Sequence, residues 1–185
     1  MKVFFDCEFT GLHQHTTLIS IGLVDEYGRK FYAEFTDYDE SQVDSWLQKN
    51  VISKLMWSED ELDEVYPMWY HRGPKKTIRQ ELLKWLYQEK PIEFVGDVCH
   101  YDFVLLIDLL FGHALSMPHD YSSACYDINQ DIAKFYKCDT QTAFNLSRES
   151  IAGKIDYENE KHNALYDAHI IKAIYEQLNK GSGIK

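Results

Sequence analysis

Three strand-like stretches within the first 36 residues constrain the fold of this chain more than any other feature. Residues 2–9, 16–25 and 30–36 are rich in β-branched and aromatic residues, and short polar connections separate them. The connection Glu26-Tyr27-Gly28-Arg29 is typical of a tight turn. Strands joined by such short connections pair antiparallel, because a parallel crossover needs many more residues. The chain is therefore expected to begin with a three-stranded antiparallel meander.

Helical and strand patterns alternate after this meander. Helical spacing runs over residues 41–56, and Thr77 with Gln80 resembles a capping box that opens a helix extending to about Tyr87. Residues 92–95 and 124–128 predict two more strands, and the almost wholly apolar residues 102–112 predict a buried helix. Helical patterns fill 129–136, 140–150 and 163–179. We predict an α/β fold in which helices cover both faces of a central mixed five-stranded sheet that begins with three antiparallel strands.

Length and composition favour one folded domain. The 185 residues, 45% hydrophobic and 15% aromatic, suffice for a core, and no repeat or Gly/Ser linker divides them. Residues 1–180 are therefore expected to form a single domain, and 181–185 a short C-terminal tail. The N-terminus lacks an apolar signal stretch, no apolar run has membrane length, and the four cysteines are scattered without a C-x-x-C pair. These features predict a cytoplasmic protein without a membrane partner.

The charge balance limits how a nucleic acid could bind. The formal net charge of −11 comes from 30 acidic and 19 basic residues, which argues against a broad cationic face for long duplexes. A nucleic-acid partner would have to be bound locally, at a short single-stranded end. One basic cluster could contribute: His71, Arg72, Lys75, Lys76 and Arg79. The alternative is a solvated loop and helix start, because charged clusters usually face water.

Two carboxylates lie near the end of the first predicted strand. Side chains alternate between the faces of a strand, so Asp6 and Glu8 project together, about 6.6 Å apart along it. Such a pair could bracket two metal ions that clamp the attacking and leaving oxygens of a phosphate ester. A lone acidic pair at a strand end more often faces solvent. The pair therefore gains meaning only together with other residues.

The last predicted helix supplies a third carboxylate. Asp167, Ile171, Ile174 and Leu178 recur at helical spacing, so the aspartate lies on the stripe that faces the core. A favourable interaction with the helix dipole would explain why this carboxylate lies in the first turn, but not why it lies on the side of the helix that faces the core. His162 can reach the same centre only from a loop before this helix, and Asn163 is a favoured N-cap at that boundary. A histidine there could act as a general base beside metal-bound water, although a surface histidine is the simpler interpretation.

A fourth carboxylate leaves two candidates. Asp102 opens the apolar helix, where capping its N-terminus and binding a metal are both open roles. Asp97, which follows a predicted strand and Gly96, competes for the same assignment. Carboxylates gathered in one place stay ionised only if cations neutralise them. The set consequently predicts a divalent-metal site that acts on a phosphate ester.

Read together, these residues resemble the DEDDh 3′ to 5′ exonucleases of the RNase H-like superfamily. Residues 6–12, Asp-Cys-Glu-Phe-Thr-Gly-Leu, are similar to the first exonuclease motif, D-x-E-x-T-G. Residues 101–106 look like the second motif, and residues 162–168, His-Asn-Ala-Leu-Tyr-Asp-Ala, are similar to the third, H-x-x-x-x-D. The closest resemblance is to the RNase AS-type exoribonucleases, with RNase T and oligoribonuclease as neighbours. One position departs: the second motif carries an asparagine four residues before its aspartate, and this chain has Val98 there.

The resemblance implies a function and roles for individual residues. It implies an RNase H-like fold and a 3′ to 5′ exoribonuclease that shortens single-stranded RNA to nucleoside 5′-monophosphates, with single-stranded DNA as the alternative substrate. Two divalent cations, Mg²⁺ or Mn²⁺, would be held by Asp6, Glu8 and Asp167 and by Asp6 with Asp102, while His162 deprotonates the attacking water. The implied substrate contacts are Phe9, Thr10, Gly11 and Leu12, joined by Arg72 and Lys76 from the basic cluster. A homodimer is expected by the same resemblance. A non-catalytic nucleic-acid-binding module is the remaining alternative.

Overall fold

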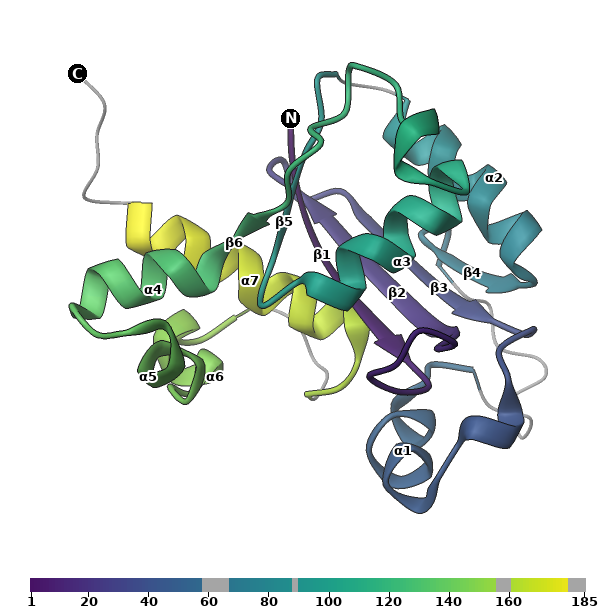
Figure 1. Ribbon diagram of the computed structural model, residues 1–185, viewed down its shortest axis with the longest axis horizontal. Helices are drawn as coiled ribbons and strands as arrows, with labels where there is room; N and C mark the ends of the chain where they lie inside the picture. Colours follow the sequence, from purple (N-terminus) through teal and green to yellow (C-terminus); the bar gives the residue numbers. More distant parts are fainter. Residues whose placement is uncertain (58–66, 88–89, 156–160, 180–185) are drawn as a thin grey trace.

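A six-stranded mixed sheet forms the centre of the computed structural model, which describes residues 1–57, 67–87, 90–155 and 161–179. The strands are β1 (Lys2–Phe9), β2 (Leu18–Asp25), β3 (Lys30–Phe35), β4 (Tyr70–Gly73), β5 (Glu93–Gly96) and β6 (Tyr126–Asp127). Their order across the sheet is β4-β3-β2-β1-β5-β6. The pairs β1–β2 and β2–β3 are antiparallel, whereas β1–β5, β3–β4 and β5–β6 are parallel (Figure 1). The predicted antiparallel meander is confirmed.

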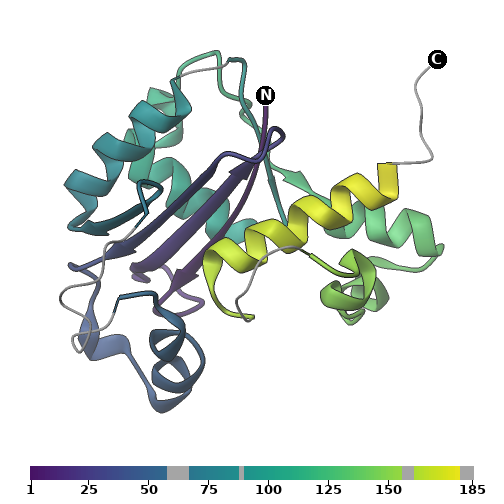
Figure 2. The same cartoon turned by 180° about the vertical axis from the view of Figure 1, so that it is seen from behind.

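Helices cover both faces of this sheet. The helices α2 (Lys75–Leu86) and α3 (His100–Phe111) pack on one face, and α7 (Ala164–Asn179) crosses the other (Figures 1 and 2). Beyond β6 lie α4 (Ile128–Tyr136), α5 (Thr140–Phe144) and α6 (Arg148–Ala152), and α1 (Ser45–Asn50) lies below the sheet in Figure 1. Side chains of β1 point alternately to the two faces of the sheet. Val3, Phe5 and Cys7 pack in the core beneath α2 and α3, whereas Phe4 packs in the core beneath α7. The α/β fold with helices on both faces is confirmed.

The predicted count of five strands is wrong. The sixth strand, β4, pairs parallel with β3 and forms the edge of the sheet. Its four residues, Tyr-His-Arg-Gly, are too short and too polar to show an alternating pattern. Residues 71 and 72 therefore belong to an edge strand, whereas the sequence pattern predicted a loop before a helix.

Two long predicted helices are broken in the structure. Residues 41–56 form the 3-10 turn η1 (Glu40–Gln42), α1 and the 3-10 turn η2 (Ile52–Lys54), because Asp44 caps a new helix by accepting a hydrogen bond from the Leu47 N–H at 2.8 Å. Residues 140–150 split into α5 and α6, and Ser147 caps the second. The predicted capping box at Thr77 is also wrong. The helix α2 begins two residues earlier, after Pro74, without a side-chain cap.

The other element boundaries agree with the predictions to within two residues, apart from the two-residue β6 within predicted 124–128. The predicted tail, 181–185, lies outside the described residues. Among the residues that the structure describes, no helix combines the length and the apolar character needed to cross a bilayer.

Candidate active site

The carboxyl end of β1 supplies two acidic side chains to a cleft of about 700 Å³. Asp6 and Glu8 lie on the α7 face of the strand, opposite to the buried Cys7. Asp97, Asp102, His162 and Asp167 also line this cleft. The predicted set therefore converges, from segments that are far apart in the sequence.

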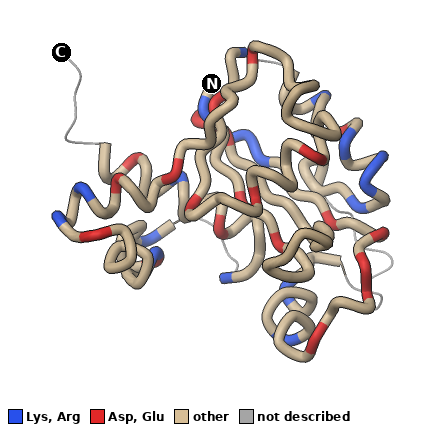
Figure 3. Tube along the Cα trace, viewed as in Figure 1, with Lys and Arg blue, Asp and Glu red and all other residues tan. Residues whose placement is uncertain are grey.

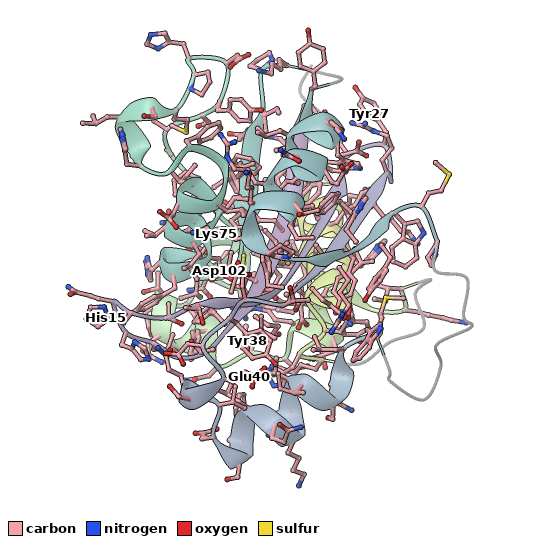
Figure 4. All side chains as sticks on the ribbon, turned by 90° about the vertical axis from the view of Figure 1, so that its right-hand side faces the viewer. His15, Tyr27, Tyr38, Glu40, Lys75 and Asp102 are labelled. Carbon is pink, nitrogen blue, oxygen red and sulfur yellow. The ribbon has the colours of Figure 1, made fainter. Side chains whose placement is uncertain are left out.

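Asp102 reaches the cleft from the first turn of α3 (Figure 4). The strand β1 extends beyond its pairing with β5, which ends at Phe4, so the Cys7 N–H has no strand partner on that side. Asp102 Oδ1 accepts the hydrogen bond from this N–H at 3.0 Å. The N-cap of α3 is Cys99, so the capping alternative for Asp102 is wrong. One oxygen of the carboxylate is thus anchored to the strand that carries Asp6 and Glu8.

His162 and Asp167 come from the start of α7. The His162 N–H donates to Asp167 Oδ2 at 2.9 Å, so the two residues hold each other. Its imidazole lies with Nδ1 at 3.9 Å from Glu8 Oε1 and meets the indole of Trp46 edge-on, with ring centroids 5.3 Å apart. One ligand atom each from Glu8, His162 and Asp167 lies within 4.8 Å of the others. These three side chains therefore share one small volume.

The buried Asn163 fixes the loop that carries His162. Its Oδ1 accepts from the Tyr166 N–H at 3.2 Å, which confirms the predicted cap, and its Nδ2 donates to the Lys54 carbonyl at 3.1 Å. His162 itself adopts a left-handed backbone conformation, with φ of 67°. The imidazole therefore points into the cleft from a loop before the helix, as the spacing to Asp167 requires.

A glycine in β2 allows α7 to approach the sheet closely. Gly22 pairs with Asp6, and a Cβ atom at position 22 would lie 2.3 Å from the backbone of Ala164 and Leu165. Any side chain there would push the start of α7, and Asp167 with it, away from β1. Gly22 was missed in the sequence. Its position inside an apolar strand could have indicated it, because a glycine there often marks the close approach of another backbone.

Burial and mutual repulsion strongly perturb the carboxyl groups. Loss of hydration raises the pKa of Asp6 well above its ordinary value, and the charges of Asp167, Asp102 and Glu8 raise it further. Loss of hydration is also the main cause that raises the pKa of Glu8 to about 8, that of Asp167 to about 7 and that of Asp102 to about 6. Burial, helped by the charge of Lys161, lowers the pKa of His162. At neutral pH the imidazole is therefore unprotonated, which is the form that can accept a proton.

The metal-free protein should lose stability as the pH rises from about 4 to about 8. In the unfolded chain the carboxyl groups ionise near 3.8 (Asp) or 4.5 (Glu), whereas in the fold they retain protons up to about 6 to 8. Rising pH removes protons from the unfolded state first and so favours unfolding. Urea unfolding in EDTA at several pH values measures the effect. Asp167→Asn or added Mg²⁺ should flatten the profile; an equal slope in all three samples would contradict the assignment.

The carboxylate set matches the ligand preferences of hard divalent cations. Mg²⁺ and Mn²⁺ favour carboxylate oxygens. Within the described ranges, no lysine or arginine forms an ion pair with Asp6, Asp102 or Asp167. Among the described residues, then, these carboxylates have no basic partner when they ionise, and a bound divalent cation would neutralise them. Asp6, Glu8, Asp102, His162 and Asp167 are the side chains available to hold or to serve such an ion.

Of the four predicted substrate contacts from the first motif, one lines the cleft and three continue into the loop beside it. Phe9 lines it and stacks on Tyr101, with ring centroids 5.8 Å apart. The buried Thr10 hydroxyl contacts Thr16, Thr17 and Gln42, so this side chain holds the loop after β1. Gly11 continues that loop, where a Cβ atom would lie 2.8 Å from the His13 ring, and Leu12 is 75% exposed. The N–H groups of Thr10 and Gly11 donate within the loop, to the Thr17 carbonyl and the Thr16 hydroxyl, so the Leu12 side chain is its most accessible part.

The structure does not bring the predicted basic contacts into the cleft. Arg72 lies on β4, three strands away from β1, and its guanidinium stacks on Trp57 at 3.7 Å. Lys76 is exposed in the first turn of α2, along which Lys and Arg gather (Figure 3). Its neighbour Lys75 pairs with Asp108. Contacts from Arg72 and Lys76 could therefore reach only a part of the substrate outside the cleft.

Asp97, the competing candidate for the second motif, is already paired. The guanidinium of Arg148 donates two hydrogen bonds to its carboxylate, from Nε to Oδ2 and from Nη2 to Oδ1. The carboxylate of Asp102 has no such partner among the described residues and accepts only backbone hydrogen bonds from Cys7 and its own turn. This difference favours Asp102. Arg148 was missed in the sequence, where it stands 51 residues from its partner without any local signal.

The fold and the convergence of carboxylates with a histidine match the class of protein that the three motifs resemble, the 3′ to 5′ exonucleases. Within that class, the chain belongs to the Rv2179c-like 3′-5′ exoribonuclease domain family, whose model matches residues 1–178. The resemblance noted in the three motifs is thereby confirmed.

Individual relatives agree with this assignment. The 3′-5′ exoribonuclease Rv2179c of Mycobacterium tuberculosis is 32% identical to this chain over 118 residues, which are 64% of the chain and 66% of that protein. The match thus spans just under two thirds of the relative. The RNase domain of the yeast Pop2 protein superposes with a TM-score of 0.62 and 16% identity over 98% of this chain and 77% of that chain. A full-length 3′-exonuclease gives a TM-score of 0.60 and 15% identity over 98% of this chain and 82% of that chain. These two structures show the shared fold.

Proposed function

We propose that this protein hydrolyses single-stranded RNA from its 3′ end to nucleoside 5′-monophosphates with the help of two divalent cations, Mg²⁺ or Mn²⁺. The observation that carries the proposal is the convergence of Asp6, Glu8, Asp102, His162 and Asp167 on one cleft. Membership of an exoribonuclease family supports RNA as the substrate.

The proposed roles follow from the positions of the side chains. Asp6 and Glu8 on β1 with Asp167 on α7 would hold one cation, and Asp6 with Asp102 the other. When bound, such a pair of cations stabilises the charge on the attacking and leaving oxygens of the phosphodiester. His162, neutral because burial lowers its pKa, would take the proton from the attacking water. Its side chain is about one-third exposed, so the proton can pass on to solvent.

The surroundings of the cleft favour a single-stranded end. The net charge of −11 opposes a long duplex, so the bound part of the RNA has to be short. Phe9 offers a ring for stacking on the terminal base, and Leu12 could wedge beside it. Thr10 and Gly11 would meet the terminal ribose through their backbone. Arg72 and Lys76 would contact phosphates farther from the 3′ end.

A degradation assay tests the proposal and its alternatives. We expect 5′-labelled RNA to give a ladder that shortens from the 3′ end in Mn²⁺ and stays intact in EDTA. Chromatography should identify nucleoside 5′-monophosphates as the products, and an RNA blocked by a 3′-phosphate should be degraded more slowly. DNA of the same sequence, tested in parallel, would be the better substrate if the protein acts on single-stranded DNA. A shifted but uncut RNA band would support a non-catalytic binding module and contradict the proposal.

We also propose, by family resemblance, that the protein forms a homodimer. A dimer could bring the basic α2 of one subunit to the acidic cleft of the other, which would compensate for the charge of the cleft. Sedimentation analysis measures the mass directly, and a monomer at assay concentrations would contradict this part.

A further inference from the structure

The guanidinium of Arg148, whose side chain is 15% exposed, uses all its hydrogen-bond donors. An arginine side chain carries five N–H groups, and Arg148 forms five hydrogen bonds. Two bind the carboxylate of Asp97, with the Nη2 bond at 3.0 Å, and a second Nη2 bond reaches Asn129 Oδ1 at 2.9 Å. The Nη1 group donates to the carbonyls of Ala143 at 2.7 Å and Leu146 at 3.1 Å. So complete a set of partners fixes both the position and the orientation of the group.

These bonds connect three parts of the fold at the edge of the cleft. Asp97 follows β5 directly, and Asn129 lies in the first turn of α4. Ala143 lies in α5 and Leu146 in the turn that joins α5 to α6. The end of α5 and this turn contribute Phe144, Asn145, Leu146 and Ser147 to the lining of the cleft. Arg148 therefore connects the end of β5 to the wall of the cleft opposite β1.

Asp97 is a fifth carboxylate beside the proposed cation ligands. It lines the same cleft as Asp6, Glu8, Asp102 and Asp167, and its charge contributes to the raised pKa of Asp6. An oxygen ligand at this position would compete for divalent cations if it were free to turn. Its pairing with Arg148 prevents this, because both carboxylate oxygens accept hydrogen bonds from the same guanidinium.

We propose that Arg148 is a positioning residue that withholds Asp97 from the cation-binding group and fixes the α5–α6 turn as a wall of the substrate cleft. The proposal rests on the proposed function, in which Asp6, Glu8, Asp102 and Asp167 hold the cations. It differs from a purely structural role, because a structural ion pair would affect folding and leave the number of bound cations unchanged. Cation stoichiometry is therefore the decisive measurement.

The experiment titrates Mn²⁺ into the metal-free protein by calorimetry, without RNA. Arg148→Met should bind one more Mn²⁺ per chain than the wild type, because the released Asp97 gains a cation in place of the guanidinium. The double variant Asp97→Asn/Arg148→Met should return to the wild-type number, because it removes the extra carboxylate as well. Arg148→Lys keeps the positive charge and should also bind the wild-type number. Circular dichroism and thermal unfolding monitor the fold of each variant.

Steady-state kinetics separates the two parts of the proposal. Loss of the Arg148 hydrogen bonds should raise KM for RNA in both Arg148→Met and the double variant, because in both the α5–α6 turn is no longer held in place. The misplaced cation should lower kcat in Arg148→Met alone, by about ten- to a hundredfold, the range found when partners of metal ligands are removed. Recovery of kcat in the double variant, with KM still raised, is the expected pattern.

Arg29→Met is the matched control. Arg29 pairs with the fully buried Asp25 at 2.6 Å, in the turn region between β2 and β3 and outside the cleft. Breaking this pair should change stability and leave Mn²⁺ stoichiometry unchanged. An unchanged Mn²⁺ number in folded Arg148→Met, or an extra ion that persists in the double variant, would overturn the proposal while the proposed function stands. If Arg148→Met does not fold, an extra ion in Arg148→Lys overturns it. A wild type that binds no Mn²⁺ would overturn both.

Discussion

Asp6→Asn should lower the turnover of single-stranded RNA by about a thousandfold, because several kcal/mol of charge stabilisation depend on the cations. Asp6 is the one carboxylate proposed to contact both ions, and it lies between Glu8 on its own strand and Asp102 and Asp167 from two helices. An asparagine keeps the shape of the side chain and removes the charge. Gel assays of single turnovers measure the loss.

The same variant has an opposite effect on the metal-free fold. Burial and four neighbouring carboxylates raise the pKa of Asp6 well above its ordinary value, so its charge destabilises the protein at high pH. Asp6→Asn should consequently be more stable than the wild type in EDTA at pH 8, yet gain less from added Mn²⁺. Thermal unfolding with and without Mn²⁺ measures both changes.

Asp108→Asn is the control for this charge removal. Asp108 lies on α3, the helix that carries Asp102, but it pairs with Lys75 outside the cleft. Its neutralisation should leave turnover and Mn²⁺ binding close to those of the wild type. Full activity in Asp6→Asn, or equal losses in the two variants, would refute the shared-ligand role.

His162→Ala should reduce turnover by about a hundred- to ten-thousandfold, the range that removal of a general base produces. The imidazole lies beside Glu8 and is about one-third exposed, where it can contact an attacking water. Because it is proposed to move a proton, its removal should leave the Mn²⁺ stoichiometry and the KM for RNA nearly unchanged. Calorimetry and steady-state kinetics together test this combination.

The geometry offers a competing role for this histidine. A ligand atom of His162 lies within 4.8 Å of ligand atoms of Glu8 and Asp167, close enough for the imidazole to bind a cation with them. A marked loss of Mn²⁺ affinity in His162→Ala would therefore reassign it as a ligand. His113→Ala is the matched control, because His113 is exposed near the end of α3 and contacts Ser116. It should retain full activity.

Local patterns in the chain were sufficient for much of the fold. The meander formed as expected, because alternating apolar residues and a tight turn act over short distances. The interruptions within 41–56 and 140–150 were harder to foresee, since a single capping side chain such as Asp44 or Ser147 can start a new helix within an otherwise helical pattern. The strand β4 depends wholly on pairing with β3, and its short polar sequence predicts nothing by itself.

The candidate site divides in the same way. Strand alternation placed Asp6 and Glu8 on one face and helical spacing turned Asp167 toward the core, whereas the resemblance to the third motif indicated His162. Only the folded molecule distinguished Asp102 from Asp97, since the Cys7 N–H anchors the first and the Arg148 guanidinium binds the second. Gly22 and Arg148 acquire their roles through contacts with residues far away in the chain. Such contacts form when elements pack in three dimensions, and no local periodicity encodes them.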